Sequence, residues 1–354
     1  MARHTLFSLL MAMSAATVAL AQLSTFPATP LVSEHFPTPS DAPYHADPGN
    51  LARGNQTGYN ICNSTTEGPT SLCQTAYVND LGDFCLWGPA QPNSTIADTE
   101  GEVVAWCTVP GHGTRIMPEG TITGAQLVKT PDYWMITGLI QQSNIDIASN
   151  DTGGELDPGG QDLRGNPIGG LLYSTAFNTT EYQINNWVNF MGSNQFCIKI
   201  CNPSGSNPEG YCQHTLDRIG SFYNCPSKYT QPTSSMQPGE FEICDSDNMQ
   251  IPGVYVENGQ TLSYSQPPES LGGITTIPYT PTIPSSSSCQ TTSSAALFAS
   301  ATASASATGS GGSSASRTSS ASGAGNTSTS GAERTIGGAG ALVLGIVFST
   351  LLLS

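Results

Sequence analysis

The residues best suited to chemistry lie in a glycine-rich acidic segment near the middle of the chain, residues 151–165. Its carboxylates are Asp151, Glu155, Asp157 and Asp162. Several carboxylates on one flexible loop could ligate Ca²⁺, which takes six to eight oxygen ligands. The spacing is not that of an EF-hand. We therefore favour a long surface loop with solvated acids, in which glycine supplies the turns and Arg164 pairs with one carboxylate.

The same carboxylates also allow a glycosidase interpretation, with Glu155 and either Asp157 or Asp162 as the acid and base. Retaining enzymes need carboxyls about 5 Å apart and inverting enzymes about 6.5–9.5 Å, a separation that spacing along the chain does not fix. No glycosidase signature accompanies these residues. The sequence also contains no G-x-S-x-G elbow, H-E-x-x-H pair, P-loop or dinucleotide fingerprint.

The histidines and aromatic residues give weaker evidence for a functional site than the carboxylates do. His112, between two glycines, and His214 each stand alone, and we expect structural roles for both. Six aromatic residues could form a platform for sugar rings or belong to the core, and we favour the core. These residues are Trp87, Trp106, Trp134, Trp187, Tyr133 and Tyr173. Trp87, in a Cys-Leu-Trp-Gly-Pro turn, is the best candidate for exposure.

Ten cysteines indicate an oxidising compartment and up to five disulfides. They are Cys62, Cys73, Cys85, Cys107, Cys197, Cys201, Cys212, Cys225, Cys244 and Cys289. No C-x-x-C pair occurs, so a zinc ribbon or a thioredoxin-like motif is unsupported. If residues 196–201 form a strand, the Cα atoms of Cys197 and Cys201 are roughly 13 Å apart and each must bond elsewhere. Cys62–Cys73 and Cys85–Cys107 are plausible pairs, but spacing does not determine connectivity.

Glycosylation sequons are spread along the chain. N-x-[ST] sequons predict N-glycans in exposed loops at Asn55, Asn63, Asn93, Asn150, Asn178 and Asn326.

The charge of the chain excludes some classes of partner. The formal net charge is −16, with only 10 Lys and Arg residues. A polyanion does not suit nucleic acid, whose phosphates bind Lys and Arg. It also argues against docking on anionic lipid through a basic patch.

Both ends of the chain carry processing signals. Residues 1–21 have a basic start, a short apolar stretch and an Ala-Leu-Ala cleavage site, which is typical of a signal peptide. Residues 331–354 end in an apolar run with no basic residue after it, preceded by small residues and a polar spacer. This pattern predicts a removable GPI signal with attachment at Ser330, or at Asn326. A tail-anchored helix is the alternative.

Composition divides the remaining chain into three zones. Residues 22–50 are Pro-rich and predict an extended arm, packed on the domain or free. Residues 51–289 hold all the cysteines and form the predicted disulfide-rich β domain. Residues 290–330 consist almost entirely of Ser, Thr, Ala and Gly, which predicts a disordered, O-glycosylated stalk.

The residue pattern of the cysteine-rich domain predicts an all-β fold, a sandwich or barrel with long loops held by disulfides. Short runs rich in aromatic and β-branched residues predict strands at 103–107, 122–128, 133–140 and 196–200. Asn258-Gly259 lies between alternating arms over residues 254–264, the strongest local hairpin signal, because a type I′ turn needs positive φ at both central residues. One short helix is expected around residues 180–188, where apolar residues have partial helical spacing.

Several blocks together resemble the macrophage-activating glycoproteins secreted by basidiomycetes. The blocks are residues 85–89, 110–114, 120–124, 153–158 with 165–170, 194–197 and 265–268. The resemblance extends over roughly residues 62–289 and implies an extracellular or cell-wall glycoprotein. It implies no catalytic residue, because no chemistry is assigned to the family.

The sequence therefore predicts a non-catalytic, GPI-anchored glycoprotein of the fungal cell surface or cell wall. We expect cell-wall glycans or wall proteins as partners, a membrane attachment through the lipid anchor, and no cofactor or nucleic acid. The alternative is a secreted hydrolase that acts on wall polysaccharide through the carboxylates of the acidic segment.

Overall fold

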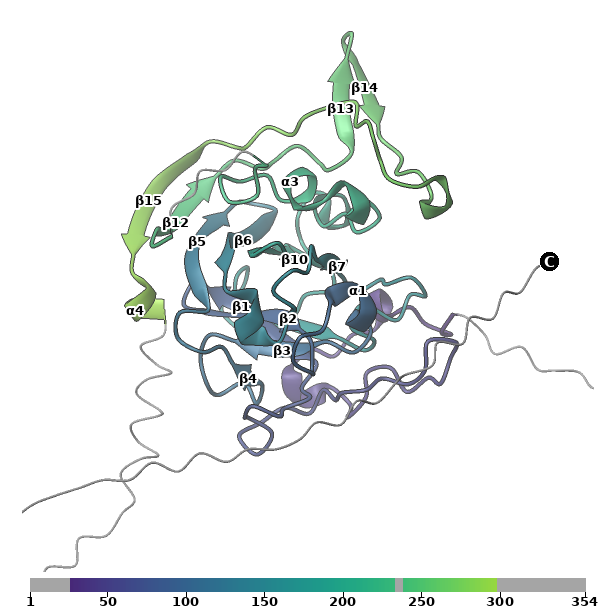
Figure 1. Ribbon diagram of the computed structural model, residues 1–354, viewed down its shortest axis with the longest axis vertical. Coiled ribbons are helices and arrows are strands. Elements are labelled where there is room, and N and C mark those ends of the chain that lie inside the picture. Colours follow the sequence, from purple (N-terminus) through teal and green to yellow (C-terminus); the bar gives the residue numbers. More distant parts are fainter. Residues whose placement is uncertain (1–25, 233–237, 298–354) are drawn as a thin grey trace, which may run out of the picture. The chain divides into compact units, whose positions relative to one another are not determined.

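The structure, a computed structural model, describes residues 26–232 and 238–297 and is mostly β (Figure 1). The predicted signal peptide, most of the stalk, the anchor signal with Ser330, and the sequon at Asn326 lie outside these ranges. Within them, no helix has the length and apolar character needed to cross a bilayer.

One sheet has six strands in the order β4-β3-β2-β1-β8-β9. The strands are β1 Thr75–Asp80, β2 Asp83–Gly88, β3 Val104–Cys107, β4 Arg115–Ile116, β8 Leu171–Ser174 and β9 Tyr182–Gln183. β1 pairs with β8 and β3 with β4 in parallel, and the other pairs are antiparallel. The predicted strand at 103–107 is confirmed as β3.

The second sheet has seven strands in the order β15-β12-β5-β6-β11-β10-β7. The strands are β5 Ile122–Lys129, β6 Tyr133–Ile140, β7 Gly154–Leu156, β10 Trp187–Gly192, β11 Gln195–Cys201, β12 Phe241–Ser246 and β15 Ser286–Thr292. Only β5 and β12 pair in parallel. The strands predicted at 122–128, 133–140 and 196–200 are confirmed as β5, β6 and β11.

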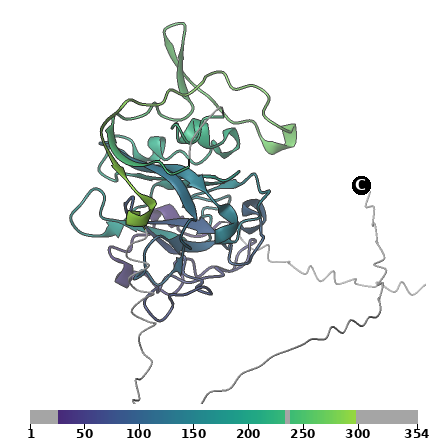
Figure 2. The same ribbon diagram turned by 60° about the vertical axis from the view of Figure 1, so that its left-hand side comes forward.

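The two sheets pack face to face, so the fold is a sandwich (Figure 2). Aromatic residues join the layers: Phe84 of β2 stacks on Phe196 of β11 at 5.9 Å, and Trp87 stacks on Trp187 at 5.7 Å. The backbone N–H of Trp87 also donates to Asn189 Oδ1 at 3.0 Å. Trp87 is fully buried. This agrees with the favoured core interpretation, even for the residue that was the best candidate for exposure, because the Trp87 ring packs against Trp187 of the other sheet.

Helical segments are short and lie in the connections. The α-helices are α1 Ile96–Thr99, α2 Pro208–Tyr211, α3 Ser221–Asn224 and α4 Ser294–Leu297. The 3₁₀ helices are η1 Leu31–Ser33, η2 Pro39–Asp41, η3 Gln142–Ile145, η4 Asp217–Ile219 and η5 Glu269–Leu271. The helix expected around residues 180–188 is absent from this described stretch, which instead holds β9 and the start of β10. That prediction was wrong because pairing of β10 with β7 and β11 outweighs a brief helical periodicity.

A second, smaller core lies between the seven-stranded sheet and residues 202–232, which include α2, η4 and α3. Two disulfides, Cys197–Cys225 and Cys201–Cys212, fasten this segment to β11. The expectation that Cys197 and Cys201 bond to other cysteines is confirmed. Because both point away from the sandwich interior, β11 buries both of its faces.

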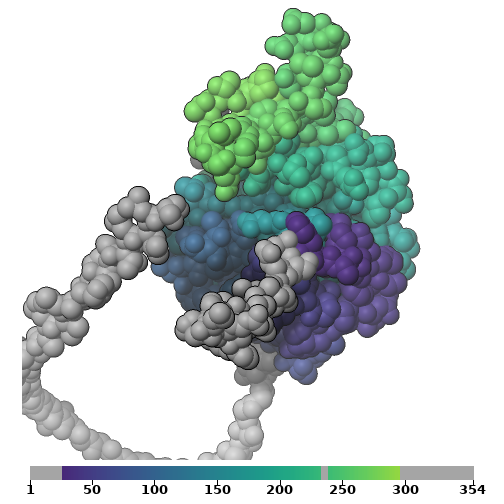
Figure 3. All heavy atoms as spheres, turned by 90° about the vertical axis from the view of Figure 1, so that its right-hand side faces the viewer, coloured from purple at the N-terminus to yellow at the C-terminus, as the bar shows by residue number. Residues whose placement is uncertain are grey.

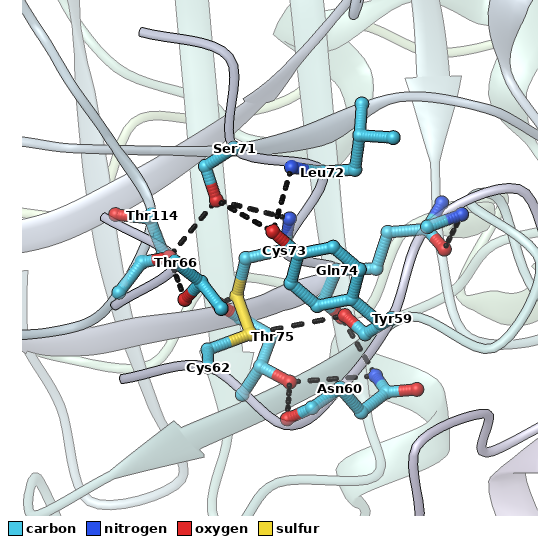
Figure 4. The surroundings of a disulfide bond; sticks show 12 residues. Tyr59, Asn60, Cys62, Thr66, Ser71, Leu72, Cys73, Gln74, Thr75 and Thr114 are labelled. Atoms are coloured by element: carbon cyan, nitrogen blue, oxygen red, sulfur yellow. Dashed lines mark hydrogen bonds between the residues drawn. A yellow bond between two sulfur atoms is a disulfide. The ribbon is translucent and has the colours of Figure 1, made fainter. Parts of the chain in front are cut away.

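Three further disulfides complete the set of ten cysteines. Cys85–Cys107 joins directly opposed residues of β2 and β3, and Cys244–Cys289 joins β12 to β15. Cys62–Cys73 fastens the loop before β1 (Figure 4). The sequence-near pairs Cys62–Cys73 and Cys85–Cys107 are thus confirmed.

Hydrogen bonds around Tyr59 reinforce the Cys62–Cys73 loop (Figure 4). Leu72 N donates to the Tyr59 hydroxyl at 3.2 Å, and Gln74 N donates to the Tyr59 carbonyl at 2.7 Å. These bonds and the Cys62–Cys73 disulfide therefore fix the loop that leads into β1.

The predicted hairpin is confirmed as β13 Val254–Glu257 and β14 Gln260–Ser263. Asn258 and Gly259 have φ values of 52° and 79°, as a type I′ turn requires. The hairpin forms its own two-stranded sheet and stands out from the described surface (Figure 3).

The described part of the Pro-rich arm packs on the domain. Leu31 is buried, and its N–H donates to Leu163 O at 2.8 Å. The Tyr173 hydroxyl donates to the carbonyls of Phe36 and Thr38. At the other end, β15 extends past the predicted boundary at residue 289, because it pairs with β12 as far as Thr292.

Removing the Cys197–Cys225 disulfide tests how residues 202–232 are held. We expect the Cys197→Ala/Cys225→Ala variant to lose about 3–4 kcal/mol of unfolding free energy, from loop-closure entropy over a sequence separation of 28 residues. Urea unfolding of the variant and the parent chain measures the loss. Unchanged stability would show that the smaller core holds this segment without the crosslink.

Candidate functional site

The acidic segment runs from the edge strand β7 into a loop that closes on itself. Asp157 and Asn166 exchange two backbone hydrogen bonds, of 3.1 and 2.8 Å. Glu155, Asp157 and Asp162 are buried, and Asp151 is half-buried. The expectation of solvated acids was therefore wrong. Its physical reason lies in tertiary packing, since the loop turns inward around Arg164.

Arg164 has no exposed side-chain surface and lies at the centre of a polar network. Its Nε donates to Asp47 Oδ2 at 2.7 Å and its Nη2 to Asp47 Oδ1 at 3.2 Å. Nη2 also donates to the carbonyls of Gly49 and Gly54. Its Nη1 lies 3.6 Å from Asp162 Oδ2, which confirms the predicted pairing with an acid of the segment. The closer partner, Asp47, comes from the N-terminal arm and was not predicted.

The network continues from Asp162 towards α1. Arg53 Nη1 donates to Asp162 Oδ1 at 2.7 Å, and Arg53 Nη2 donates to Asn166 Oδ1 at 2.5 Å. Asn166 Nδ2 in turn donates to Glu100 Oε2 at 3.1 Å. Glu100, which follows α1, is thereby fixed next to β7.

Asp157 stabilises the loop that follows it. Its Oδ1 accepts hydrogen bonds from Gly159 N at 2.5 Å and Gly160 N at 2.8 Å. His214 Nδ1 lies 3.3 Å from the same oxygen. Asp157 therefore acts as a cap for its own turn and links it to residues 202–232.

The four carboxylates do not form one ligand set. Asp151 accepts from Ile96 N at 2.8 Å and Gly153 N at 3.0 Å, so it caps α1 and its own turn. Among the described residues, one group of His, Cys, Asp and Glu has ligand atoms close enough together for a metal. That group is Glu242, Cys244 and Cys289, whose sulfurs form a disulfide. The Ca²⁺ loop stays a prediction without geometric support.

A cavity of about 430 Å³ opens between β7, the β10–β11 turn and the η4–α3 segment. Figure 1 shows β7, β10 and α1 on the same side of the domain. The polar and aromatic lining residues are Glu100, Thr152, Glu155, Phe190, Ser193, Gln195, Phe196, Asp217, Arg218 and Ser221. Of the predicted acids, only Glu155 lines this cavity. Glu100 and Asp217 were not predicted from the sequence, because they lie far from Glu155 in the chain.

Glu155 is the buried carboxyl of the cavity, with 7% of its surface exposed. Its Oε1 has no hydrogen-bond partner among the described residues. Burial, the charge of Asp157 and a hydrogen bond with the Asp157 side chain raise the pKa of Glu155 well above its usual range. These surroundings favour the protonated, neutral carboxyl of Glu155 over its charged form.

Glu100 shares this environment. Burial is the main cause that raises its pKa to about 7, and Arg53 opposes the shift. The negative charges of Asp157 and Asp217 add to the increase. Two carboxyls at one cavity are therefore kept neutral in mildly acidic medium.

Backbone packing forms the rim of the cavity. Gly153 has φ of 98°, and a Cβ there would lie 1.7 Å from the Met191 carbonyl oxygen. A Cβ on Gly192, with φ of 138°, would lie 2.2 Å from Gly153 Cα. Both positions require glycine, since larger residues would separate the chain after Asn150 from the β10–β11 turn.

The other predicted candidates are structural. Trp106, Trp187, Tyr133 and Tyr173 are buried and Trp134 is half-buried, so the core interpretation is confirmed and no tryptophan lines the cavity. His112 Nε2 lies 2.7 Å from Asp83 Oδ1, and its ring stacks on Tyr77 at 4.0 Å. This agrees with the structural role expected for His112.

Lys199 is a buried basic residue that the sequence did not single out. Its Nζ donates to the Asn224 carbonyl at 2.5 Å and contacts Met249 Sδ at 3.6 Å. Burial lowers the pKa of Lys199 to about 7, and Glu155 partly opposes the shift. Only its position in β11, between two cysteines that face the smaller core, could have indicated this burial.

The described sequons lie on the surface. The exposed residues are Asn55, Asn63, Asn93, Asn150 and Asn178. Their occupancy by glycans stays a prediction.

Two curated fungal proteins are similar to this chain. The appressorium protein ROW1 of Mycosarcoma maydis is 43% identical over 215 residues, which cover 60% of this chain and 48% of ROW1. The appressorium protein ROW2 of the same fungus is 39% identical over 217 residues, which cover 60% of this chain and 72% of ROW2. The chain thus spans about half the length of ROW1. No family model and no solved structure matches it.

The raised carboxyl pKa values predict that stability falls as the pH rises from about 4.5 to 7. Below that range Glu100 is protonated in both the folded and the unfolded chain. Within it the unfolded chain has already released the proton that the folded chain still holds, which favours unfolding. Glu155 and Glu181 act in the same direction, whereas Lys199 stays protonated in both states below about pH 7.

Thermal unfolding at pH 5 and pH 7 in equal salt measures this dependence. We expect a lower Tm at pH 7, by about 2–4 °C for each 1 kcal/mol lost. Glu155→Gln should reduce the difference between the two pH values. A Tm that rises from pH 5 to pH 7 would contradict the raised pKa values of Glu100 and Glu155.

Truncating Arg164 tests the buried network. We expect Arg164→Met to lower the free energy of unfolding by about 3–5 kcal/mol, because it leaves Asp47 buried without its cation. Glu240→Gln is the control, since Glu240 is exposed in its pair with Lys228 and should change stability by about 1 kcal/mol or less.

Adding Asp47→Leu to Arg164→Met separates the ion pair from general packing. The double variant should lose less free energy of unfolding than the two single variants lose together, by about 1 kcal/mol or more. Additive losses in urea unfolding would show that the two side chains contribute independently.

Proposed function

Because this chain belongs to the family of the appressorium proteins ROW1 and ROW2, we propose that it is a non-catalytic glycoprotein of the fungal cell surface. A GPI anchor holds it at the membrane, and a Ser- and Thr-rich stalk carries the β domain outward into the wall. Its partners are wall glycans or wall proteins. The resemblance to the macrophage-activating glycoproteins remains part of this proposal.

The observation that carries the proposal is the disulfide sandwich itself. Five disulfides use all ten cysteines, which fits an oxidising compartment outside the cytosol. The described sequons lie on exposed loops, where glycans do not disturb the core. The terminal signals that support secretion and anchoring lie outside the described residues.

The acidic cavity is the site that supports glycan binding best. Its volume lies within the range of about 300–1,000 Å³ that is usual for small-ligand sites. Residues with hydroxyl, amide and carboxyl side chains line it, together with Phe190 and Phe196. Such a mixture suits a ligand rich in hydroxyl groups.

Release by phospholipase tests the anchor. We expect phosphatidylinositol-specific phospholipase C to release the full chain from intact fungal protoplasts. A variant that ends at residue 330 should appear in the medium without the enzyme. Retention of the full chain after treatment, with residues 331–354 still present, would replace the GPI anchor by the tail-anchored helix.

A secreted hydrolase remains the second candidate, because Glu155 has the raised pKa of a general acid and lines a cavity. The contacts of Asp157 oppose it. Its Oδ1 accepts hydrogen bonds from the backbone amides of Gly159 and Gly160, so Asp157 is committed to its own turn and is not free to act as the second carboxylate. Turnover of β-glucan that Glu155→Gln abolishes would establish the hydrolase.

A further inference from the structure

The cavity at the edge of the seven-stranded sheet contains a carboxyl group prepared for a partner that the chain does not supply. Glu155 is more than nine-tenths buried and lines the cavity, and its Oε1 has no hydrogen-bond partner among the described residues. Buried polar atoms are almost always hydrogen-bonded, because an unmade bond costs about 1–3 kcal/mol. A ligand that donates to Glu155 would remove this cost.

Acidic side chains predominate around Glu155, and the nearby buried amine of Lys199 donates to the Asn224 carbonyl. Glu100 and Asp217 line the same cavity, and Asp157 lies against Glu155. Arg218 is the one basic lining residue, but its guanidinium donates to the carbonyls of two loop residues. Those acceptors are Pro267 and Gly272. Acidic groups therefore outnumber basic ones in the lining, and the protonated carboxyls of Glu155 and Glu100 can ionise when a cation binds.

A divalent metal fits this arrangement poorly. The lining carboxylates do not bring their oxygens within 4.8 Å of one another as a set of three, as far as the described residues show. A volume of about 430 Å³ also exceeds what one ion needs, given that a water molecule occupies about 30 Å³. The ligand must therefore spread its charge and its polar groups over a larger scaffold.

Uncommitted polar side chains surround the carboxyls. Thr152, Ser193, Gln195 and Ser221 line the cavity, and their side chains make no hydrogen bond within the described part of the chain. Thr152 and Ser193 are exposed at the mouth, and Gln195 and Ser221 are half-buried. These groups can donate to and accept from hydroxyls, which a simple alkyl amine lacks.

We propose that this cavity binds an amino sugar with a free, unacetylated amine. The ammonium group pairs with Glu155 and Glu100, and the ring hydroxyls bond to Gln195 and the other rim side chains. This inference rests on the proposed glycan-binding function and names the class of glycan. A charge-assisted bond between an ammonium and a buried carboxylate is stronger than a neutral one, so the amine determines selectivity.

Calorimetric titration of the full secreted chain tests the inference, with a β-1,4-linked glucosamine tetramer as the probe. The fully N-acetylated tetramer and a neutral glucose tetramer are the comparison probes. All titrations use 150 mM salt, which screens general attraction to a chain with net charge −16. We expect binding of the free-amine tetramer at least tenfold tighter than that of either comparison probe.

Variants then locate the binding site. Glu155→Gln should weaken binding of the glucosamine tetramer at least tenfold, because it keeps the shape and removes the charge. Glu257→Gln makes the same change of net charge on the exposed hairpin and should leave binding unchanged. Gln195→Ala, at the half-buried rim, should weaken binding several-fold and provides the test if Glu155→Gln does not fold.

The outcomes distinguish this inference from the proposed function. Unchanged binding in both Glu155→Gln and Gln195→Ala overturns the assignment of the cavity. Equal or tighter binding of the neutral or acetylated tetramer overturns the requirement for an amine but keeps glycan binding. Binding of a lysine-rich peptide in place of every sugar overturns the amino-sugar class, while phospholipase release would still support the surface anchor.

Discussion

Arg164 is completely buried, and its guanidinium reaches Asp47 from a position 117 residues away in the chain. Withdrawing such a charge from water costs several kcal/mol, so the fold depends on the carboxylate and carbonyls that surround it. Those acceptors come from the segment 47–54, which ties the N-terminal arm to the acidic loop. Asp162 and Arg53 extend the same network to Asn166 and Glu100. The acidic loop is thus an inward-facing part of the domain.

This network explains why one carboxyl differs from its neighbours. The three other carboxylates of the loop bind backbone amides or arginine, which fixes the loop against β7 and α1. They are Asp151, Asp157 and Asp162. Glu155 is left at the cavity with its proton, because burial and Asp157 disfavour its charge. The same arrangement that stabilises the loop therefore produces a neutral acid poised to ionise when a cation binds. A domain built in this way suits an acidic medium.

The sequence predicted the features that depend on local chemistry. Asn258-Gly259 encodes a type I′ turn through its two residues alone, and the hairpin formed as expected. Strand geometry was enough to exclude a Cys197–Cys201 bond. The failures have a common cause in tertiary packing. The acids expected in solvent turn inward around Arg164, and residues 180–188 join a strand ladder in spite of helical spacing.

By itself, the sequence determined an all-β, cysteine-rich domain, the positions of its main strands and the acidic character of its central loop. These follow from residue type, alternation and turn chemistry, which act over a few neighbouring residues. Only the tertiary structure decided that the acids are buried, that Asp47 pairs with Arg164, and that Glu100 and Asp217 join Glu155 at one cavity. The physical reason is that burial and ion pairing depend on which distant segments pack together, and no local pattern along the chain specifies those partners.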